Sequence, residues 1–139
     1  MEDFTKYWCF RLAALSRKIS RSYNNICLKY GITASQSFVL LDVLANEGSS
    51  VKDIANRIQL DSPAVTGLID RLLKEELVER REDPADRRSL QIYLTDKGRQ
   101  LIEDLNPAGK EFNHHIRSLL SAEEGQLFEE CLSKLEKDF

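Results

Sequence analysis

The sequence of 139 residues is poor in cysteine and has no long apolar run. Its three cysteines, Cys9, Cys27 and Cys131, fit neither a disulfide scaffold nor a C-x2-C zinc pattern, and this favours a reducing compartment. No apolar stretch approaches the roughly 18 residues of a membrane helix. Residues 1–15 mix charged and apolar side chains, unlike a secretory signal. We therefore expect a cytoplasmic protein without a membrane span.

Motifs for catalysis and for metal binding are also missing. The sequence has no nucleophile elbow, no phosphate-binding loop, no HExxH pair and no clustered carboxylates. Its two histidines, His114 and His115, are adjacent, so on a helix they would diverge by about 100° and could not hold one metal ion as an i, i+4 pair would. These absences predict a protein that is not an enzyme, with no catalytic residue, no metal site and no cofactor.

The net charge is −3, and the acidic excess lies at the end of the chain. Residues 50–99 have ten basic and ten acidic side chains, whereas residues 100–139 have four basic and nine acidic ones. Binding to nucleic-acid phosphates needs a basic surface where the protein faces the phosphates, and it does not need a positive net charge of the whole protein. The middle of the chain offers candidates for such a face, namely Arg57, Arg71, Lys74, Arg80, Arg81, Arg87 and Arg88.

Two successive helices are predicted between residues 51 and 74. The first has one apolar face at i, i+3, i+4 and i+7 spacing, formed by Val51, Ile54, Ala55 and Ile58. The second begins near Asp61 and Ser62, which are N-cap residues, with Pro63 at the first helical position. The side chains on its outer face are short, small or charged, and belong to Ser62, Thr66, Gly67, Asp70, Arg71 and Lys74. The pair matches either a helix-turn-helix, whose second helix enters the major groove, or an ordinary helical hairpin.

An alternating segment follows these helices. Leu90, Ile92 and Leu94 alternate with Gln91 and Tyr93, the period of a half-buried strand. Residues 82–89 before it are charged and are predicted to form the long tip of a hairpin. A wing of this kind can carry arginines into the minor groove, where negative potential is concentrated. The alternative is that residues 86–88 form only a solvated loop tip.

The hairpin and its flanks contain a specific motif. It consists of Asp83-Pro84, Asp86-x-Arg88, five intervening residues, Leu94-Thr95, and finally Asp96-Lys97-Gly98. This pattern resembles the wing signature of the MarR family of winged helix-turn-helix transcriptional regulators. The resemblance extends through Gly31-Ile32-Thr33 and the helix with Leu40 and Leu41 to the long terminal helices, so it covers essentially the whole chain.

The resemblance implies a mainly α fold with a small β-hairpin, in a single MarR-type domain over residues 1–139. A winged helix-turn-helix lobe over residues 33–98 would lie between dimerisation helices over residues 1–30 and 100–139. Asp86 would pair with Arg71 and so fix the wing relative to the recognition helix. The expected DNA contacts are Ser62, Pro63, Thr66 and Arg71 on the recognition helix, and Arg87 and Arg88 in the wing.

Long helices are predicted before this lobe. The first runs from about Phe4 to Tyr30, a length of about 40 Å that one small domain cannot cover. Its stripe comprises Trp8, Leu12, Leu15, Ile19, either Ser22 or Tyr23, Ile26 and Tyr30. A second helix is expected from Gln36 to about Asn46, with a core face of Phe38, Leu41, Val43 and Leu44.

After the wing, Thr95 is predicted to cap a helix that Pro107 kinks or breaks near residues 106–109. A capping box from Ser121 to Glu124 starts the last helix, whose apolar stripe comprises Leu127, Phe128, Cys131, Leu132 and Leu135. Because both ends keep apolar faces, we expect a homodimer rather than a monomer. A two-fold dimer can place its recognition helices about 34 Å apart on a pseudo-palindromic operator.

The sequence leaves two alternatives for the signal that regulates the protein, an oxidant or a small ligand. Cys9 resembles the amino-terminal cysteine with which one branch of the MarR family senses organic hydroperoxides, and Tyr23 lies where that branch has a tyrosine bonded to the thiol. On one helix the two would be about 21 Å apart, so contact would require the other subunit. Ala13 and Ala34 replace further tyrosines of that branch, which favours a buried structural Cys9.

The other signal is a small aromatic or lipophilic ligand, for which the candidate pocket residues are Trp8, Leu12, Tyr30 and Phe38. Together these observations predict a dimeric regulator that binds double-stranded DNA sequence-specifically, most simply a repressor released by a ligand or an oxidant. The alternative is a winged-helix protein-interaction module that does not bind DNA.

Overall fold

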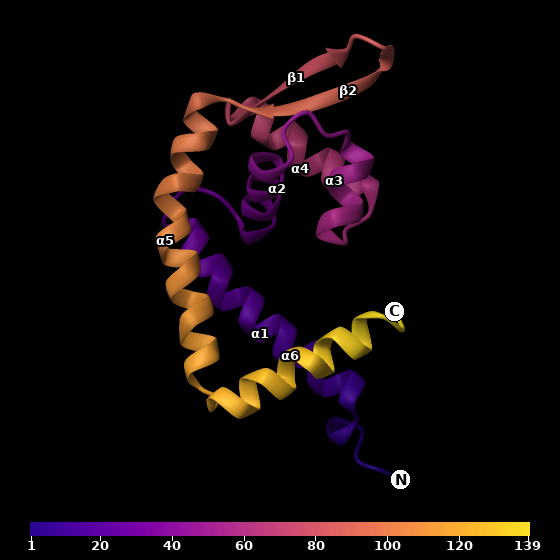
Figure 1. Cartoon of the computed structure of the whole chain (residues 1–139), viewed down its shortest axis with the longest axis vertical. Coiled ribbons are helices and arrows are strands. Elements are labelled where there is room, and N and C mark those ends of the chain that lie inside the picture. The colour runs from indigo at the N-terminus through magenta and orange to yellow at the C-terminus, as the bar shows by residue number, and fades with distance from the viewer. The chain divides into compact units, whose positions relative to one another are not determined.

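The computed structural model describes residues 1–139 and is mainly α-helical with one β-hairpin, as predicted (Figure 1). The elements are a 3₁₀ turn η1 (Phe4–Lys6), α1 (Trp8–Leu28), α2 (Ala34–Ala45), α3 (Val51–Ile58), α4 (Ser62–Lys74), β1 (Val78–Asp83), β2 (Asp86–Leu94), α5 (Asp96–Ser118) and α6 (Ala122–Glu136). The chain divides into two compact units, Met1–Asn106 and Pro107–Phe139, and α5 runs through both.

The first unit contains the hydrophobic core, which α2, α3, α4 and the hairpin build together with residues of α1 and α5. Figure 1 shows the three helices gathered on one side of the hairpin. Burial of apolar surface is the main driving force for such packing. The largest fully buried side chains are Ile32, Val39, Leu40, Val43, Ile54, Val65, Ile69, Leu72, Ile92, Ile102 and Leu105, together with Cys27.

The expected core face of α2 was wrong in one position. Phe38 is 47% exposed, whereas its neighbours Val39 and Leu40 are fully buried. Phe38 instead stacks on Tyr23 of α1, with ring centroids 5.4 Å apart. The helix therefore turns Val39, Leu40 and Val43 towards the core and leaves Phe38 at its margin.

Helix starts follow the capping residues. Thr33 forms a capping box with Gln36 at the start of α2. Asp61 caps α4 by accepting a hydrogen bond from the backbone of Ala64, 2.8 Å away, so the helix begins at Ser62 and Pro63 takes its second position rather than its first. Between α3 and α4 the chain turns through Gln59, which has the left-handed conformation with φ of 60°.

The hairpin has a shorter tip than expected. Strands β1 and β2 pair antiparallel from Val78 opposite Leu94 to Asp83 opposite Asp86, so that only two residues connect them. The Asp83 side chain accepts a hydrogen bond from the backbone of Ala85, 2.9 Å away, which closes the turn tightly. Ser49 forms an isolated bridge with Ile92, which joins the loop before α3 to the wing.

Helix α5 is continuous through Pro107, so the predicted break is absent (Figure 1). A proline inside a helix removes the hydrogen bond to the carbonyl four residues earlier. Here that carbonyl belongs to Glu103, which is exposed like Pro107, and water can satisfy it. Thr95 caps the start of the helix as predicted, since its Oγ1 accepts from the backbone of Gly98 at 3.0 Å.

The second unit consists of all of α6 and of the part of α5 that begins at Pro107. The predicted capping box of α6 is present, because Ser121 and Glu124 exchange side-chain and backbone hydrogen bonds of 2.9 and 3.1 Å. The backbone and side chain of Ser121 lower the pKa of Glu124. Arg117 pairs with Glu129 across the two helices, and α6 has no buried residue. None of the helices combines the length and apolar character that crossing a membrane requires.

Candidate DNA interface

Helix α4 has one buried side and one exposed side. Val65, Ile69 and Leu72 are buried in the core. The side chains predicted to contact DNA from this helix, Ser62, Pro63, Thr66 and Arg71, are all exposed. The Thr66 hydroxyl donates a hydrogen bond to the carbonyl oxygen of Ser62 at 2.9 Å. The recognition face proposed from the sequence is therefore open to solvent on a helix that the core holds rigidly.

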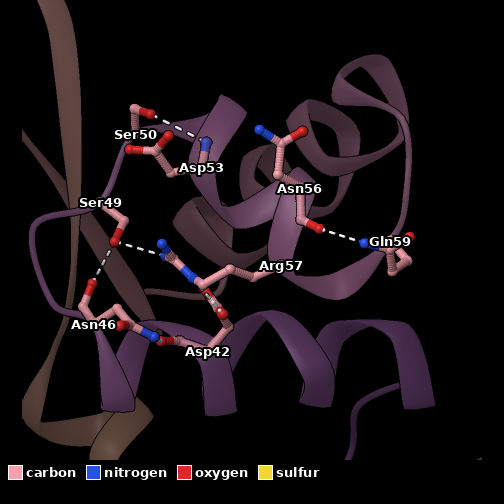
Figure 2. Close-up of polar contacts among 8 residues, drawn as sticks. All are labelled: Asp42, Asn46, Ser49, Ser50, Asp53, Asn56, Arg57 and Gln59. Atoms are coloured by element: carbon pink, nitrogen blue, oxygen red, sulfur yellow. Dashed lines mark hydrogen bonds and ion pairs between the residues drawn. The ribbon is translucent and has the colours of Figure 1, made fainter. Parts of the chain in front are cut away.

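The first helix of the pair, α3, is fastened to α2 by Arg57 (Figure 2). The guanidinium donates to both carboxylate oxygens of Asp42, at 2.8 and 2.9 Å, and to Ser49 Oγ at 2.7 Å. The bond to Asp42 raises the pKa of Arg57. Ser49 donates in turn to the carbonyl of Asn46 at 2.6 Å.

This cluster changes the role expected for Arg57. The sequence placed Arg57 among candidates for a phosphate-facing basic surface, but three hydrogen bonds commit its guanidinium to the lobe itself. A bidentate arginine–carboxylate pair fixes geometry as well as charge. Because Ser49 also bridges to Ile92, the cluster connects α2, α3 and the wing. Sequence spacing gave no signal for it, since Asp42 and Arg57 lie 15 residues apart.

The end of the wing presents two free arginines. Arg87 and Arg88 are exposed on β2 next to the turn, and neither side chain takes part in an ion pair of the chain. Arg81 differs, because it pairs with Glu79 and lies 3.9 Å from the centre of the Tyr93 ring. The positive charges of Arg87 and Arg88 are therefore not neutralised by an acidic residue of the chain, unlike that of Arg81.

The expected pairing of Asp86 with Arg71 is absent, and a different pair links the wing to the recognition helix. Arg80 on β1 contacts Asp70 on α4 at 2.6 Å. Asp86 instead accepts a hydrogen bond from the backbone of Arg88 at 2.9 Å. The register explains this, since Asp86 lies at the end of the hairpin, about 17 Å of strand away from the Val78–Leu94 pair that adjoins α4.

The redox candidates lie apart in the protomer. Cys9 is exposed, so its predicted burial is wrong, and the buried cysteine is Cys27. The amino-terminal half of α1 has no core beside it, whereas Cys27 lies on the face that meets the core. Tyr23 is hydrogen-bonded to Ser37 at 3.1 Å, and burial raises the pKa of its hydroxyl. Both Cys9 and Tyr23 belong to α1, which keeps them about 21 Å apart along one helix.

The candidate pocket residues do not gather in the protomer. Trp8, Leu12 and Phe38 are exposed, and only Tyr30 lines a cleft, whose volume is about 530 Å³. The cleft lies within the first unit, and its lining comprises Tyr30, Gly31, Ile32, Glu75, Leu77, Lys97, Gln100, Leu101 and Asp104. Sequence reasoning missed most of these residues because they come from three separate segments with no shared periodicity.

The arrangement of α3, α4 and the hairpin defines the structural class of the protein. Two helices joined by a short turn, the second exposed along one side and followed by a hairpin with free arginines at its end, form a winged helix-turn-helix. The model of the MarR family matches residues 32–90, from the start of α2 into β2. The uncharacterized HTH-type transcriptional regulator YsmB of Bacillus subtilis (strain 168) is 34% identical over 128 residues, which are 91% of this chain and 85% of that protein.

Two further comparisons agree. The HTH-type transcriptional regulator TtmR of Methylorubrum extorquens (strain PA1) is 40% identical over 93 residues, which are 67% of this chain but only 48% of TtmR. The structure of MepR of S. aureus, solved in complex with DNA, has a TM-score of 0.90 and 25% identity, and the match covers 96% of this chain and 98% of MepR. The chain belongs to the MarR family and is a DNA-binding transcriptional regulator.

Proposed function

We propose that the chain acts in the cytoplasm as a homodimeric repressor of a pseudo-palindromic operator and releases the DNA when a small ligand binds. The observation that carries the proposal is the surface formed by the exposed side of α4 and the free arginines of the wing. On this surface α4 enters the major groove with Ser62, Pro63 and Thr66 forward, and Arg71 contacts phosphate. Arg87 and Arg88 reach the minor groove from the hairpin.

The terminal helices support the homodimer. Trp8 is 75% exposed, and Leu12 and Leu15 on the same helix are about half exposed. Along α6 the stripe of Leu127, Phe128, Leu132 and Leu135 is also exposed. Contiguous apolar surface of this kind marks an interaction site. A second copy of the chain, related by two-fold symmetry, would cover both stripes and set the spacing of the two recognition helices.

The cleft near Tyr30 is the site that we propose for the ligand. Leu77 and Leu101 give it apolar walls, and Lys97 and Asp104 give it charged ones. It joins the turn after α4 to the first turns of α5, so a ligand there contacts both the lobe and the helix that leads to the second unit. A coupling of about 1 to 3 kcal/mol would change operator affinity 5- to 150-fold.

One contact of Tyr23 favours a ligand over an oxidant as the signal. The Tyr23 hydroxyl, which would have to hold the Cys9 thiol, is already bonded to Ser37 of its own chain.

The test is operator binding by Arg88→Ala. We expect selection of random duplex DNA by the purified chain to give a two-fold motif, and Arg88→Ala to weaken binding to it by about 1 to 3 kcal/mol with the dimer intact. Arg117→Ala, which removes the same charge from the second unit, is the matched control. Wild-type affinity of Arg88→Ala at fixed salt would remove the wing from the interface. No salt-dependent binding to any duplex would favour the interaction-module alternative.

A further inference from the structure

Thr66 presents a defined set of chemical groups on the exposed side of α4. Its hydroxyl donates its hydrogen to the carbonyl oxygen of Ser62, one turn earlier in the helix, at 2.9 Å. A hydroxyl has a single hydrogen, so Thr66 Oγ1 keeps only acceptor capacity. What Thr66 offers to a groove is therefore one acceptor oxygen and one methyl group.

The exposed side chains of the first turns of α4 carry no N–H group, and the Arg80 guanidinium is held at 2.6 Å by Asp70, which lies one turn after Thr66. The exposed residues of the first turns are Ser62, Pro63, Ala64, Thr66 and Gly67. The first arginine, Arg71, follows Thr66 by five residues, about 7.5 Å further along the helix axis. Nothing lies within 4 Å of the position that a Cβ of Gly67 would take, so the surface beside Thr66 is open. Proteins most often recognise guanine through an arginine or lysine side chain that donates hydrogen bonds to O6 and N7. This part of α4 has neither residue.

An A·T base pair has the complementary groups in the major groove. Adenine presents the N6 amino donor, and thymine presents the C5 methyl. A G·C pair also presents an amino donor, on cytosine N4, but no methyl group. We propose that Thr66 determines specificity by reading one A·T base pair in each half-site, with its methyl against the thymine methyl and its Oγ1 accepting from adenine N6. This inference rests on the proposed function and adds the base pair that α4 selects.

The experiment uses the operator that the wild-type chain of 139 residues selects from random duplexes. Each thymine of a half-site is replaced in turn by uracil, which lacks only the C5 methyl, and binding is measured at fixed salt. We expect one position at which uracil weakens wild-type binding by about four-fold, the factor that corresponds to one buried methyl group. Thr66→Ser keeps the hydroxyl and loses the methyl, so it should bind the thymine and uracil duplexes equally.

Two further variants separate the methyl from the oxygen and from general effects. Thr66→Val keeps a methyl group and loses the acceptor, so it should retain the uracil effect and lose sensitivity to replacing the paired adenine with purine, which lacks the N6 amino group. Thr5→Ser removes the same methyl from an exposed threonine of η1 and should behave as wild type.

The outcomes distinguish the inference from the function on which it rests. If wild type selects an operator and every uracil substitution affects wild type and Thr66→Ser alike, Thr66 does not read thymine and the inference fails while the proposed function stands. If the wild-type chain binds no duplex in a salt-dependent way, the proposed function fails and takes the inference with it.

Discussion

The winged lobe and the terminal segments of this chain use their apolar residues in opposite ways. Every buried hydrophobic side chain lies between Cys27 and Leu105, whereas η1 and α6 have no buried residue and α1 has only Cys27. The lobe thus completes its core within one protomer. The ends keep Trp8, Leu15 and Leu127 at the surface, as a chain does when a partner supplies the missing contacts.

The two regions should respond differently to substitution. A change in the lobe should alter the free energy of unfolding of the protomer, because its contacts are internal. A change on the exposed stripes should alter association and leave the fold of the lobe intact.

The largest effect is expected from opening the proposed dimer. In the double variant Leu12→Glu, Leu15→Glu, two charges replace apolar side chains that are 47% and 51% exposed. We expect sedimentation to give a 16.0 kDa species and operator affinity to fall by about 10² to 10⁴, the gain that linking two binding modules provides. Urea unfolding of the lobe should change little.

Lys18→Glu, at an exposed polar position of the same helix, controls for charge. A double variant that stays dimeric would show that α1 does not form the interface. One that unfolds would show that these leucines belong to the protomer's own core, and the division between lobe and ends would fail.

Gly98 provides the next effect, on the lobe side. A Cβ at this position would lie 2.0 Å from the carbonyl oxygen of Leu77, a backbone atom that already accepts a hydrogen bond from Thr95 at 3.2 Å. The strands and α5 hold both segments, so neither can move freely. We expect Gly98→Ala to lower the free energy of unfolding by about 3 kcal/mol in urea titration.

Gly125 in α6 is the matched glycine of the terminal region. No atom lies within 4 Å of its Cβ position, and alanine is the better helix former, so Gly125→Ala should raise helix stability by about 1 kcal/mol. Opposite signs for the two substitutions would show that Gly98 is tightly packed and that Gly125 is not. Equal and small effects would mean that Leu77 and α5 do not pack as the structure has them.

Local signals predicted the elements better than their contacts. Asp61, Thr95 and Ser121 marked helix starts because an N-cap acts through backbone groups two or three residues away. At Pro107, where the sequence predicted a kink or a break, the helix does not break, because the carbonyl that loses its hydrogen bond belongs to an exposed residue, Glu103.

The contacts of the candidate site were harder to predict, because they join distant residues. Arg80 with Asp70, and Arg57 with Asp42, depend on strand register and helix packing that no short motif encodes. The exposed face of α4 was predicted correctly, since helical periodicity alone separates Thr66 and Arg71 from the buried Ile69.

The smallest effect concerns Tyr23, at the point where α1 meets the lobe. Burial raises the pKa of its hydroxyl above the usual 10.0, although Ser37 acts in the opposite direction. The folded state therefore prefers the neutral phenol. Its contribution to stability is complete below pH 10 and is lost as the pH rises through the higher pKa of the folded state.

Tyr23→Phe should thus cost about 1 kcal/mol at neutral pH, through the lost hydrogen bond to Ser37. Above pH 10 the variant should lose stability less steeply than wild type, because phenylalanine has no proton to release. Tyr7→Phe, in the exposed segment before α1, is the control and should keep the wild-type slope in urea titrations between pH 8 and about pH 11. If both variants keep that slope, Tyr23 is as open to water as Tyr7, and the packed lobe does not extend to this part of α1.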